Sequence, residues 1–419
     1  MGRFVDCIVV GGGVAGLSTA LRLAQAGMTV TVVEENQLGA GASTGNQGVL
    51  HSGALYSLSH PRMIKTCLEA VKAISMSFPD AISYSGGSWY LASLERFRAL
   101  QRMWSQIGFP YSRLTSTELA RFVRGDLIPR VGGARVFDKV IDTRLFVVNL
   151  AAHCLASRVQ FVTTTRIQSV ECASNGVRGV VTDSGELLAA ERVVICAGLG
   201  SRRLLACAHL KSGTRLKSRL GVVVAFPNKS VEHPIMCSNH GGPAIVPTRE
   251  GYVLATRLGL PQRWTDARNP SPQNPSSAAE AKEIASALRG LLSPGIVDWD
   301  IGKVWTCTKT EGVNGHVNVS GVEPNVMVID HEREDNIRGL WTMLPGKMTL
   351  VLHASRQLTE GMLRRPVELM ISRHASLPPT IFSDAMQMVV PSRTDSTNFQ
   401  EIGMSNEMKG QSEWLEDSA

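Results

Sequence analysis

The sequence predicts an α/β fold with two domains, and two observations support this prediction. The first is the order of elements at the amino end: a β-prone run, a glycine-rich turn, a helical stretch and a second apolar run follow one another within residues 6–35. The second is the length of 419 residues, which exceeds what one core usually serves and predicts two domains. With 43% hydrophobic and 19% charged residues, the chain has enough apolar material for both.

The glycine-rich turn has the spacing Gly-x-Gly-x-x-Gly, which is typical of dinucleotide-binding proteins when a strand precedes it and a helix follows. Gly11 permits the tight turn, Gly13 lets a diphosphate approach the backbone, and Gly16 lets the helix pack on the strand. The first amides of the helix, at Val14 and Ala15, carry a partial positive charge that attracts phosphates.

Two acidic residues follow the second apolar run, which we predict as a strand over 28–33. A carboxylate at Glu34, with Glu35 beside it, is placed to accept hydrogen bonds from a ribose diol. Strand, glycine turn, helix, strand and acid together predict a Rossmann-type dinucleotide site.

A long loop of small and polar residues follows over 39–53. A simple nicotinamide-binding Rossmann domain normally has a helix there, so this loop favours a flavin. The segment 48–56, Gly-Val-Leu-His-Ser-Gly-Ala-Leu-Tyr, resembles the flavin-contacting loop of the D-amino acid oxidase-like superfamily. It is similar to the glycerol-3-phosphate dehydrogenase and L-2-hydroxyglutarate oxidase members. This resemblance assigns the following loop residues to FAD: Ser43, Thr44, Asn46, Gln47, Gly48 and Val49.

Further segments resemble the same superfamily, in the order that it requires. They are a strand over 89–92, a strand and helix over 136–155, a strand over 161–170, a buried strand with small residues over 192–201, and a strand, glycine turn and helix over 337–349. The last contains Gly-Lys-Met-Thr, similar to the Gly-Lys-Leu-Thr of glycerol-3-phosphate dehydrogenases. The FAD contacts that the resemblance implies here are Ile167, Ala197, Gly198, Ser201, Gly346, Lys347, Met348 and Thr349.

The resemblance implies a Rossmann-type FAD-binding domain interleaved with an α+β substrate domain built on a mostly antiparallel sheet. The FAD-binding domain is expected over 1–85, 141–215 and 311–375, and the substrate domain over 86–140 and 216–310. The chain turns polar after Ser376, so residues 376–419 are expected to form a tail outside the catalytic core.

The chemistry that the resemblance implies is removal of a hydride, to flavin N5, from a C–H carrying a hydroxyl or an amine. His51 is the first catalytic candidate, because an imidazole beside the flavin can accept a hydroxyl proton. Lys347 is the second, since an ammonium there can bind a carboxylate or phosphate. Lys309, Arg257 and Tyr252 are candidates for substrate binding. Family members often have an Arg-Pro pair near Lys309, and this chain has neither residue there.

We therefore expect an FAD enzyme that oxidises a small hydroxy acid or polyol phosphate and passes electrons to oxygen, a quinone or a carrier protein. An amine or amino-acid oxidase and a non-catalytic flavoprotein subunit are the alternatives. Some amine-oxidising relatives attach FAD to a cysteine in a segment comparable to that of Cys307, and His51 offers another point of attachment. We expect a non-covalent flavin and interpret Cys307 as a small core residue.

Composition excludes several other classes. Eight cysteines without a Cys-x-x-Cys pair argue against a zinc or redox-disulfide site and fit a reducing, cytoplasmic compartment. No signal peptide and no apolar run long enough for a bilayer are visible, which leaves peripheral contact with the inner face of a membrane, and oligomerisation, open. The net charge is +7. Its longest basic stretch, from Arg202 to Arg219, lacks interleaved aromatics, so we interpret it as a solvated face and not a nucleic-acid site.

Overall fold

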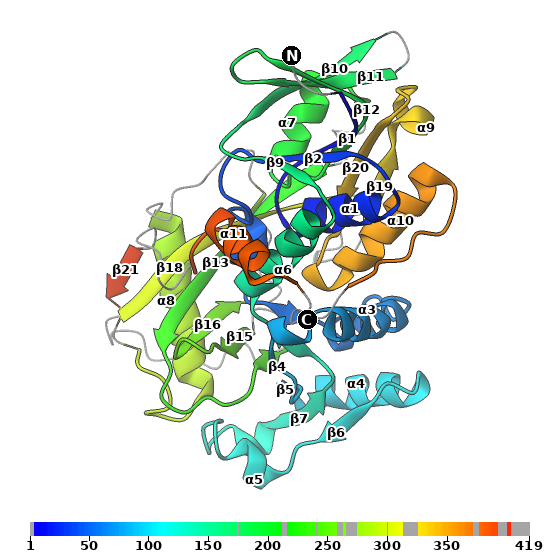
Figure 1. Ribbon diagram of the computed structural model, residues 1–419. Helices are drawn as coiled ribbons and strands as arrows, with labels where there is room; N and C mark the ends of the chain where they lie inside the picture. The colour runs from blue at the N-terminus through cyan, green and yellow to red at the C-terminus, as the bar shows by residue number, and fades with distance from the viewer. Residues whose placement is uncertain are drawn as a thin grey trace.

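The strands of this protein form two large sheets and one small sheet (Figure 1). The computed structural model describes residues 4–173, 176–211, 216–238, 242–257, 263–264, 275–299, 301–312, 326–371, 377–392 and 400–403. No helix in these ranges combines the length and apolar character needed to cross a bilayer.

The first sheet has a parallel core built from short apolar strands. Its strands are β1 (Val5–Val10), β2 (Val30–Val33), β9 (Gln160–Val162), β10 (Ile167–Ala173), β11 (Gly176–Thr182), β12 (Leu187–Ile195), β19 (Met327–Asp330) and β20 (Leu340–Leu344). The order β19-β20-β12-β1-β2-β9 is parallel throughout except for β19 with β20. Strands β10 and β11 extend β12 as antiparallel neighbours.

Helices cover both faces of this sheet, which a parallel sheet requires. One face carries α1 (Val14–Gln25), α6 (Thr143–Ala156), α10 (Val351–Leu363) and α11 (Pro379–Met388), whose side chains share one apolar cluster with Cys7 and Val9. On the other face, α7 (Gly200–Cys207) packs against Ile8 and Val10. Alternate residues of β1 thus pack into two different hydrophobic cores, one on each face of the sheet. The predicted Rossmann-type α/β fold is confirmed.

The prediction of one strand over 161–170 is wrong, because two strands, β9 and β10, occupy this stretch. A turn separates them, in which Thr164 has a positive φ of 55°. The amides of Thr164 and Thr165 donate to the carbonyls of Asn36 and Glu34, after the end of β2. These bonds direct the chain out of the parallel sheet, and alternation of apolar residues alone does not reveal them.

The second sheet is mostly antiparallel, as predicted. Its strands are β5 (Ser88–Ser93), β6 (Tyr111–Arg113), β7 (Val131–Val136), β13 (Leu216–Pro227), β14 (Ile235–Cys237), β15 (Pro243–Pro247), β16 (Tyr252–Arg257), β17 (Arg263–Trp264), β18 (Ile301–Gly312) and β21 (Gln400–Gly403). The order is β21-β18-β13-β16-β15-β14-β5-β7-β6, with β17 beside β13, and only β14 with β5 is parallel. Helices α5 (Ser116–Leu119) and α8 (Pro275–Leu291) share one core with this sheet, and α4 (Leu94–Gln106) shares another.

The small sheet connects segments that are distant in sequence. It consists of β3 (Val49–Leu50), β8 (Lys139–Ile141) and β4 (Ile82–Tyr84), in that order and all antiparallel. The remaining elements are α2 (Ala42–Gly45), α3 (Met63–Ser77), α9 (His331–Asp335) and the 3-10 turns η1 (Ala54–Tyr56), η2 (Pro79–Ala81), η3 (Ile128–Arg130) and η5 (Met348–Leu350).

The prediction that the chain after Ser376 lies outside the core is wrong for residues 377–392. Helix α11 packs beside α6 (Figure 1), with Ala385 fully buried and Val389 only 2% exposed. Strand β21 adds to the second sheet by pairing with β18. The polar composition of the whole segment conceals one short amphipathic helix, so composition alone gives the wrong answer. Residues 404–419 lie outside the described ranges.

Candidate functional site

A cavity of about 1480 Å³ lies between the two large sheets. Its wall includes the end of β1 and the glycine turn on one side and strands β13 and β18 on the other. Pockets for drug-sized ligands usually measure ~300–1,000 Å³, so this one has room for a dinucleotide and a small substrate together.

The glycine turn forms a close-packed cradle at one end of the cavity. Gly11 has a φ of 109°, and a Cβ there would lie 2.5 Å from the Cys196 carbonyl oxygen. A Cβ on Gly16 would lie 1.9 Å from the Gly11 carbonyl oxygen. A Cβ on Gly13 would meet the Ser43 hydroxyl at 2.7 Å. A Cβ on Gly11 or Gly16 would overlap the backbone, and a Cβ on Gly13 would displace the Ser43 hydroxyl. Glycine at these positions keeps the turn tight and lets a diphosphate approach the backbone at the start of α1.

Glu34 fixes this cradle as well as facing the cavity. Its carboxylate accepts hydrogen bonds from the Gly12 amide at 2.6 Å and from the Asn36 amide at 3.0 Å. Burial raises the pKa of Glu34, although the two amide bonds favour the charged form. Each oxygen keeps a further lone pair with which to accept a ribose hydroxyl. Glu35 is exposed and pairs with Arg166 at 3.8 Å.

The polar loop predicted to contact the flavin is held by its own side chains. The Ser43 hydroxyl accepts from the Val14 amide at 3.0 Å. The Asn46 amide group donates to the carbonyls of Ala42 and Ser43 and accepts from the Gly48 amide. Asn46 therefore holds the loop in shape through its side chain. Only the hydrogen-bonding capacity that these three bonds leave unused is available to a ligand in the cavity.

Gln47 and Thr44 point into protein contacts. The Gln47 side chain donates to the carbonyls of Ala244 on β15 and Leu254 on β16, which ties the loop to the second sheet. The Thr44 hydroxyl donates to the Gly39 carbonyl. Hydrogen bonds within the protein therefore account largely for the polar side chains of Gln47 and Thr44.

Most of the predicted FAD contacts line the cavity. Those that do are Gly11, Gly13, Val14, Ala15, Glu34, Glu35, Ser43, Asn46, Gln47, Val49, Ile167, Ala197, Gly198, Gly346, Lys347 and Met348. Those that do not are Gly16, Thr44, Gly48, Ser201 and Thr349, whose contact with FAD stays a prediction. Gly48, with a φ of 74°, packs where a Cβ would lie 2.2 Å from the Ile141 carbonyl.

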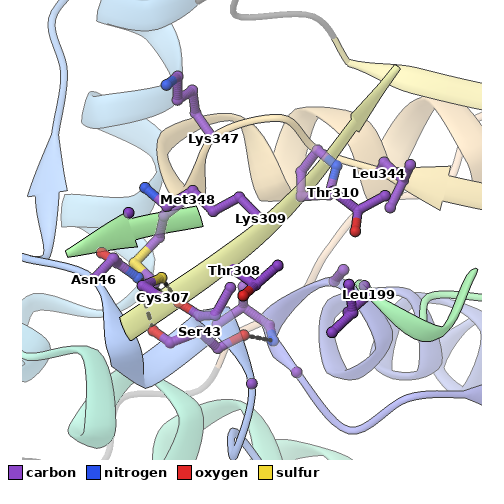
Figure 2. Close-up of a pocket in the computed structure, with 18 of the residues that line it drawn as sticks. Ser43, Asn46, Leu199, Cys307, Thr308, Lys309, Thr310, Leu344, Lys347 and Met348 are labelled. Atoms are coloured by element: carbon purple, nitrogen blue, oxygen red, sulfur yellow. Dashed lines mark hydrogen bonds between the residues drawn. The ribbon is translucent and has the colours of Figure 1, made fainter. Parts of the chain in front are cut away.

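Three basic residues line another part of the cavity. Lys309 extends from β18 and Lys347 comes from the turn after β20 (Figure 2). Arg219 on β13 lies directly across from Lys309. The carboxylate of Glu311 accepts from Arg219 Nε at 3.0 Å and from Nη2 at 2.8 Å. We call these four residues the charged cluster. It carries one negative and three positive groups when all are ionised.

Burial and mutual repulsion shape the ionisation of the charged cluster. Burial lowers the pKa of Lys309, and burial with the nearby Arg219 lowers that of Lys347 well below its ordinary value. Burial also opposes the charges of Arg219 and Glu311, but their ion pair prevails, raising the pKa of Arg219 and lowering that of Glu311. An anion beside the two lysines would relieve their repulsion and favour their charged forms.

His51 faces the cavity near this cluster. Its backbone amide donates to the Thr349 hydroxyl at 2.9 Å, which joins the histidine loop to the turn that carries Lys347. The Tyr56 ring lies 6.0 Å from the His51 ring and 6.0 Å from Lys347 Nζ. Among the described residues His51 Nδ1 has no hydrogen-bond partner, and its nearest carboxylate oxygen belongs to Asp138 at 3.8 Å.

Asp138 is fully buried and held in a fixed position. One carboxylate oxygen accepts from the Ser52 amide and hydroxyl at 2.7 and 2.6 Å, and the other accepts from the Tyr90 hydroxyl at 3.0 Å. The carboxylate therefore presents a negative charge to the His51 imidazole.

The two remaining substrate-binding candidates differ in position. Arg257 lines the cavity but donates to Glu283 at 2.9 Å. Tyr252 does not line the cavity, so the prediction of substrate contact is corrected. Its ring instead packs under Lys303 Nζ, 4.7 Å away, and among the apolar residues around Trp305.

Cys307 is buried where β18 meets the flavin loop. Its sulfur lies 4.0 Å from the Ala42 carbonyl oxygen and 3.5 Å from where a Cβ on Gly45 would stand. The side chain both packs as a small core residue and lines the cavity.

The sequence analysis missed Glu311 and misplaced Arg219. Arg219 belongs to the basic stretch interpreted as a solvated face, and its side chain is only 17% exposed. Arg203, in the same stretch, donates to the carbonyls of Ile167 and Gln168. Glu311 could have been found, because residues two apart on a strand share a face and Lys309 was already a candidate.

Comparison with known proteins supports one family. A family model described as DAO, FAD dependent oxidoreductase, matches residues 6–334. The anaerobic glycerol-3-phosphate dehydrogenase subunit A1 of Haloferax volcanii is 24% identical over 86% of this chain and 64% of its own length. A probable FAD-dependent oxidoreductase of Pseudomonas aeruginosa is 30% identical over 48% of this chain and 53% of its own. The chain thus spans less than two thirds of these relatives.

Solved structures share the fold across most of the chain. Glycine oxidase from Geobacillus kaustophilus has a TM-score of 0.69 at 19% identity and covers 89% of this chain and 99% of its own. The L-α-glycerophosphate oxidase of Mycoplasma pneumoniae, solved with FAD bound, has a TM-score of 0.67 at 17% identity, with 89% and 97% covered.

Proposed function

The chain belongs to the DAO family of FAD-dependent oxidoreductases and its cofactor is FAD, and on this premise we propose that it oxidises a small anionic hydroxy acid or polyol phosphate at the C–H bond beside the hydroxyl group. The observation that carries this proposal is the charged cluster, whose three basic residues line the same cavity as His51. The relatives described as glycerol-3-phosphate dehydrogenases support the choice of a hydroxyl substrate.

In this proposal the charged cluster holds the substrate anion. Arg219 presents a guanidinium fixed by Glu311, and Lys309 and Lys347 add ammonium groups from two other directions. Charge-assisted bonds of this kind position a carboxylate or phosphate, and so orient the carbon to be oxidised. The charged cluster thereby takes the place of the missing Arg-Pro pair.

Bound FAD supplies the acceptor for the two electrons that leave with the hydride. His51 accepts the hydroxyl proton, and the buried Asp138 carboxylate stabilises the resulting imidazolium from 3.8 Å. The Thr349 hydroxyl keeps the histidine loop in register with Lys347. The substrate thus loses a hydride from its carbon and a proton from its hydroxyl group, and the alcohol becomes a carbonyl.

Amine oxidation is the second candidate, because solved structures of this fold include glycine oxidase and an amino acid oxidase, NikD. The charged cluster would hold an amino acid through its carboxylate in the same way. A non-catalytic flavoprotein subunit is the third candidate, since one relative is described as subunit A1 of a larger enzyme. For all three we propose non-covalent FAD and, as electron acceptor, oxygen, a quinone or a carrier protein.

Anaerobic bleaching of the bound flavin tests the proposal. We expect 2-hydroxy acids or polyol phosphates to bleach the yellow protein, while neutral polyols of the same length do not. Bleaching by amino acids alone would support amine oxidation. Flavin that no member of either panel reduces would contradict both enzymatic candidates.

Arg219→Met tests the role of the charged cluster. Losing a charge-assisted bond, which is worth ~1.5–3 kcal/mol, should raise KM for the anionic substrate by about 10- to 100-fold. Arg202→Met is the matched control, because Arg202 is an exposed residue of the same basic stretch. Equal KM values for the two variants would remove Arg219 from the substrate site.

A further inference from the structure

Residues 388–391 run from the last residue of α11 to the wall of the cavity, next to the FAD cradle. We call them the C-terminal strap. Val390 and Pro391 belong to the cavity wall, as do Gln37 and Ala40 from the segment after β2. We propose that the C-terminal strap is part of the FAD site, where it fixes the segment on which the glycine turn rests. This inference depends on the cofactor and not on the identity of the substrate.

The strap pairs with the segment after β2 through its backbone. The Leu38 amide donates to the Met388 carbonyl at 2.9 Å, and the Val390 amide donates to the Leu38 carbonyl at 3.1 Å. Leu38 and Val389 form a parallel bridge and are both buried. Both backbone hydrogen-bonding groups of Leu38 are therefore satisfied by the strap.

The opposite side of the same segment supports the glycine turn. The Gly39 amide donates to the Gly12 carbonyl at 3.0 Å. A Cβ on Gly12 would lie 2.5 Å from Leu38 Cδ2, so the Leu38 side chain packs directly against the turn. The C-terminal strap, Leu38 and the glycine turn thus form three successive layers, and the diphosphate binds on the last.

Two anchors hold the strap in place. Arg144 on α6 donates through Nε to the Val390 carbonyl at 2.9 Å and approaches the Met386 sulfur through Nη1 at 3.7 Å. Further along, β21 pairs with β18 in the second sheet (Figure 1). The described residues after 376 therefore contact the segment after β2 and the second sheet. Without the strap, Leu38 would be exposed and the layer beneath the glycine turn would lose its support.

The affinity of the full-length protein for FAD tests this inference. Val390→Pro removes the amide that donates to Leu38, and Arg144→Met removes the side-chain anchor. Each should raise the dissociation constant of FAD at least tenfold, as measured by titrating the apoprotein and following flavin fluorescence. Asp384→Ala is the control, because Asp384 is exposed on α11, and it should stay within twofold of wild type.

The melting temperature of each apoprotein separates cofactor binding from general stability. A merely structural strap would lower this temperature and leave the dissociation constant unchanged, and that result would overturn the inference. Dissociation constants within twofold of wild type for both variants would overturn it as well. If Val390→Pro does not fold, the dissociation constant of FAD for Arg144→Met alone decides whether the inference holds. Substrate bleaching plays no part in these measurements, so the proposed function can fail independently.

Discussion

At the residue scale, the charged cluster is unfavourable for folding. Arg219 and Lys309 stand directly opposite each other on neighbouring strands, where like charges repel. Glu311 offsets part of this repulsion through its ion pair with Arg219. The remaining positive charge lies in a cavity, away from bulk water. Such an arrangement is typical of a site that is completed by an anionic ligand.

Lys347→Met should remove part of this unfavourable positive charge and so change the unfolding free energy of the apoprotein. Because the pKa of Lys347 is lowered in the folded state, the folded protein binds fewer protons than the unfolded chain between the two pKa values. The ammonium therefore destabilises the fold most below the folded pKa, and the destabilisation fades as pH rises towards the ordinary value. We expect the variant to be more stable than wild type near neutral pH.

Urea unfolding of both apoproteins at neutral and at alkaline pH measures this difference. The difference in unfolding free energy between the variant and wild type should be smaller at the higher pH. A difference that is absent, or that widens with pH, would show that Lys347 is not destabilised by burial.

At the scale of elements, the cradle depends on the backbone geometry of the junction between β1 and α1 more than on any contact that side chains make there. The junction brings the Gly16 Cα beside the Gly11 carbonyl, and the first residues of α1, Val14 and Ala15, line the cavity. The loop after β2 completes the cradle through the bond from the Val14 amide to Ser43.

Gly16→Ala should abolish FAD binding. Its methyl group would lie 1.9 Å from the Gly11 carbonyl oxygen, so the helix must shift away from the strand. Gly125→Ala is a matched control, because a methyl group there has no atom within 4 Å. The ratio of flavin to protein absorbance after purification measures the effect. A Gly16→Ala protein as yellow as wild type would show that the turn does not bind the dinucleotide.

At the scale of the whole molecule, the two domains are joined across the cavity by polar contacts. Gln47 extends from the flavin loop to two carbonyls of the second sheet. The Trp305 indole on β18 donates to the Gly45 carbonyl at 3.0 Å. The flavin loop is therefore fixed by both domains, which keeps the cofactor and the charged cluster in register.

Gln47→Leu should loosen this junction. Two hydrogen bonds are lost, which costs ~1–3 kcal/mol of unfolding free energy. Gln106→Leu, at an exposed position on α4, should have no such effect. Urea unfolding of the holoproteins measures the difference. Equal midpoints for both variants and wild type would show that the contact does not join the domains.

The sequence by itself determined the amino-terminal fold and the class of cofactor. The glycine spacing, the flanking apolar runs and Glu34 are local signals, and local backbone geometry produces the cradle that they predict. Resemblance along the chain indicated the family that the comparisons show. His51, Lys347 and Lys309 each lie in or near a readable motif and line the cavity, and their catalytic and binding roles stay predictions.

Only the tertiary structure decided which charges face one another and where the end of the chain lies. Arg219 meets Glu311 through pairing between strands that are far apart in sequence, and the basic stretch around Arg219 suggests solvent when taken alone. Tyr252 has the alternation of a strand residue, but strand packing places it outside the cavity. The segment 377–392 was misassigned because its burial depends on α6 and Leu38, which no local pattern within the segment encodes.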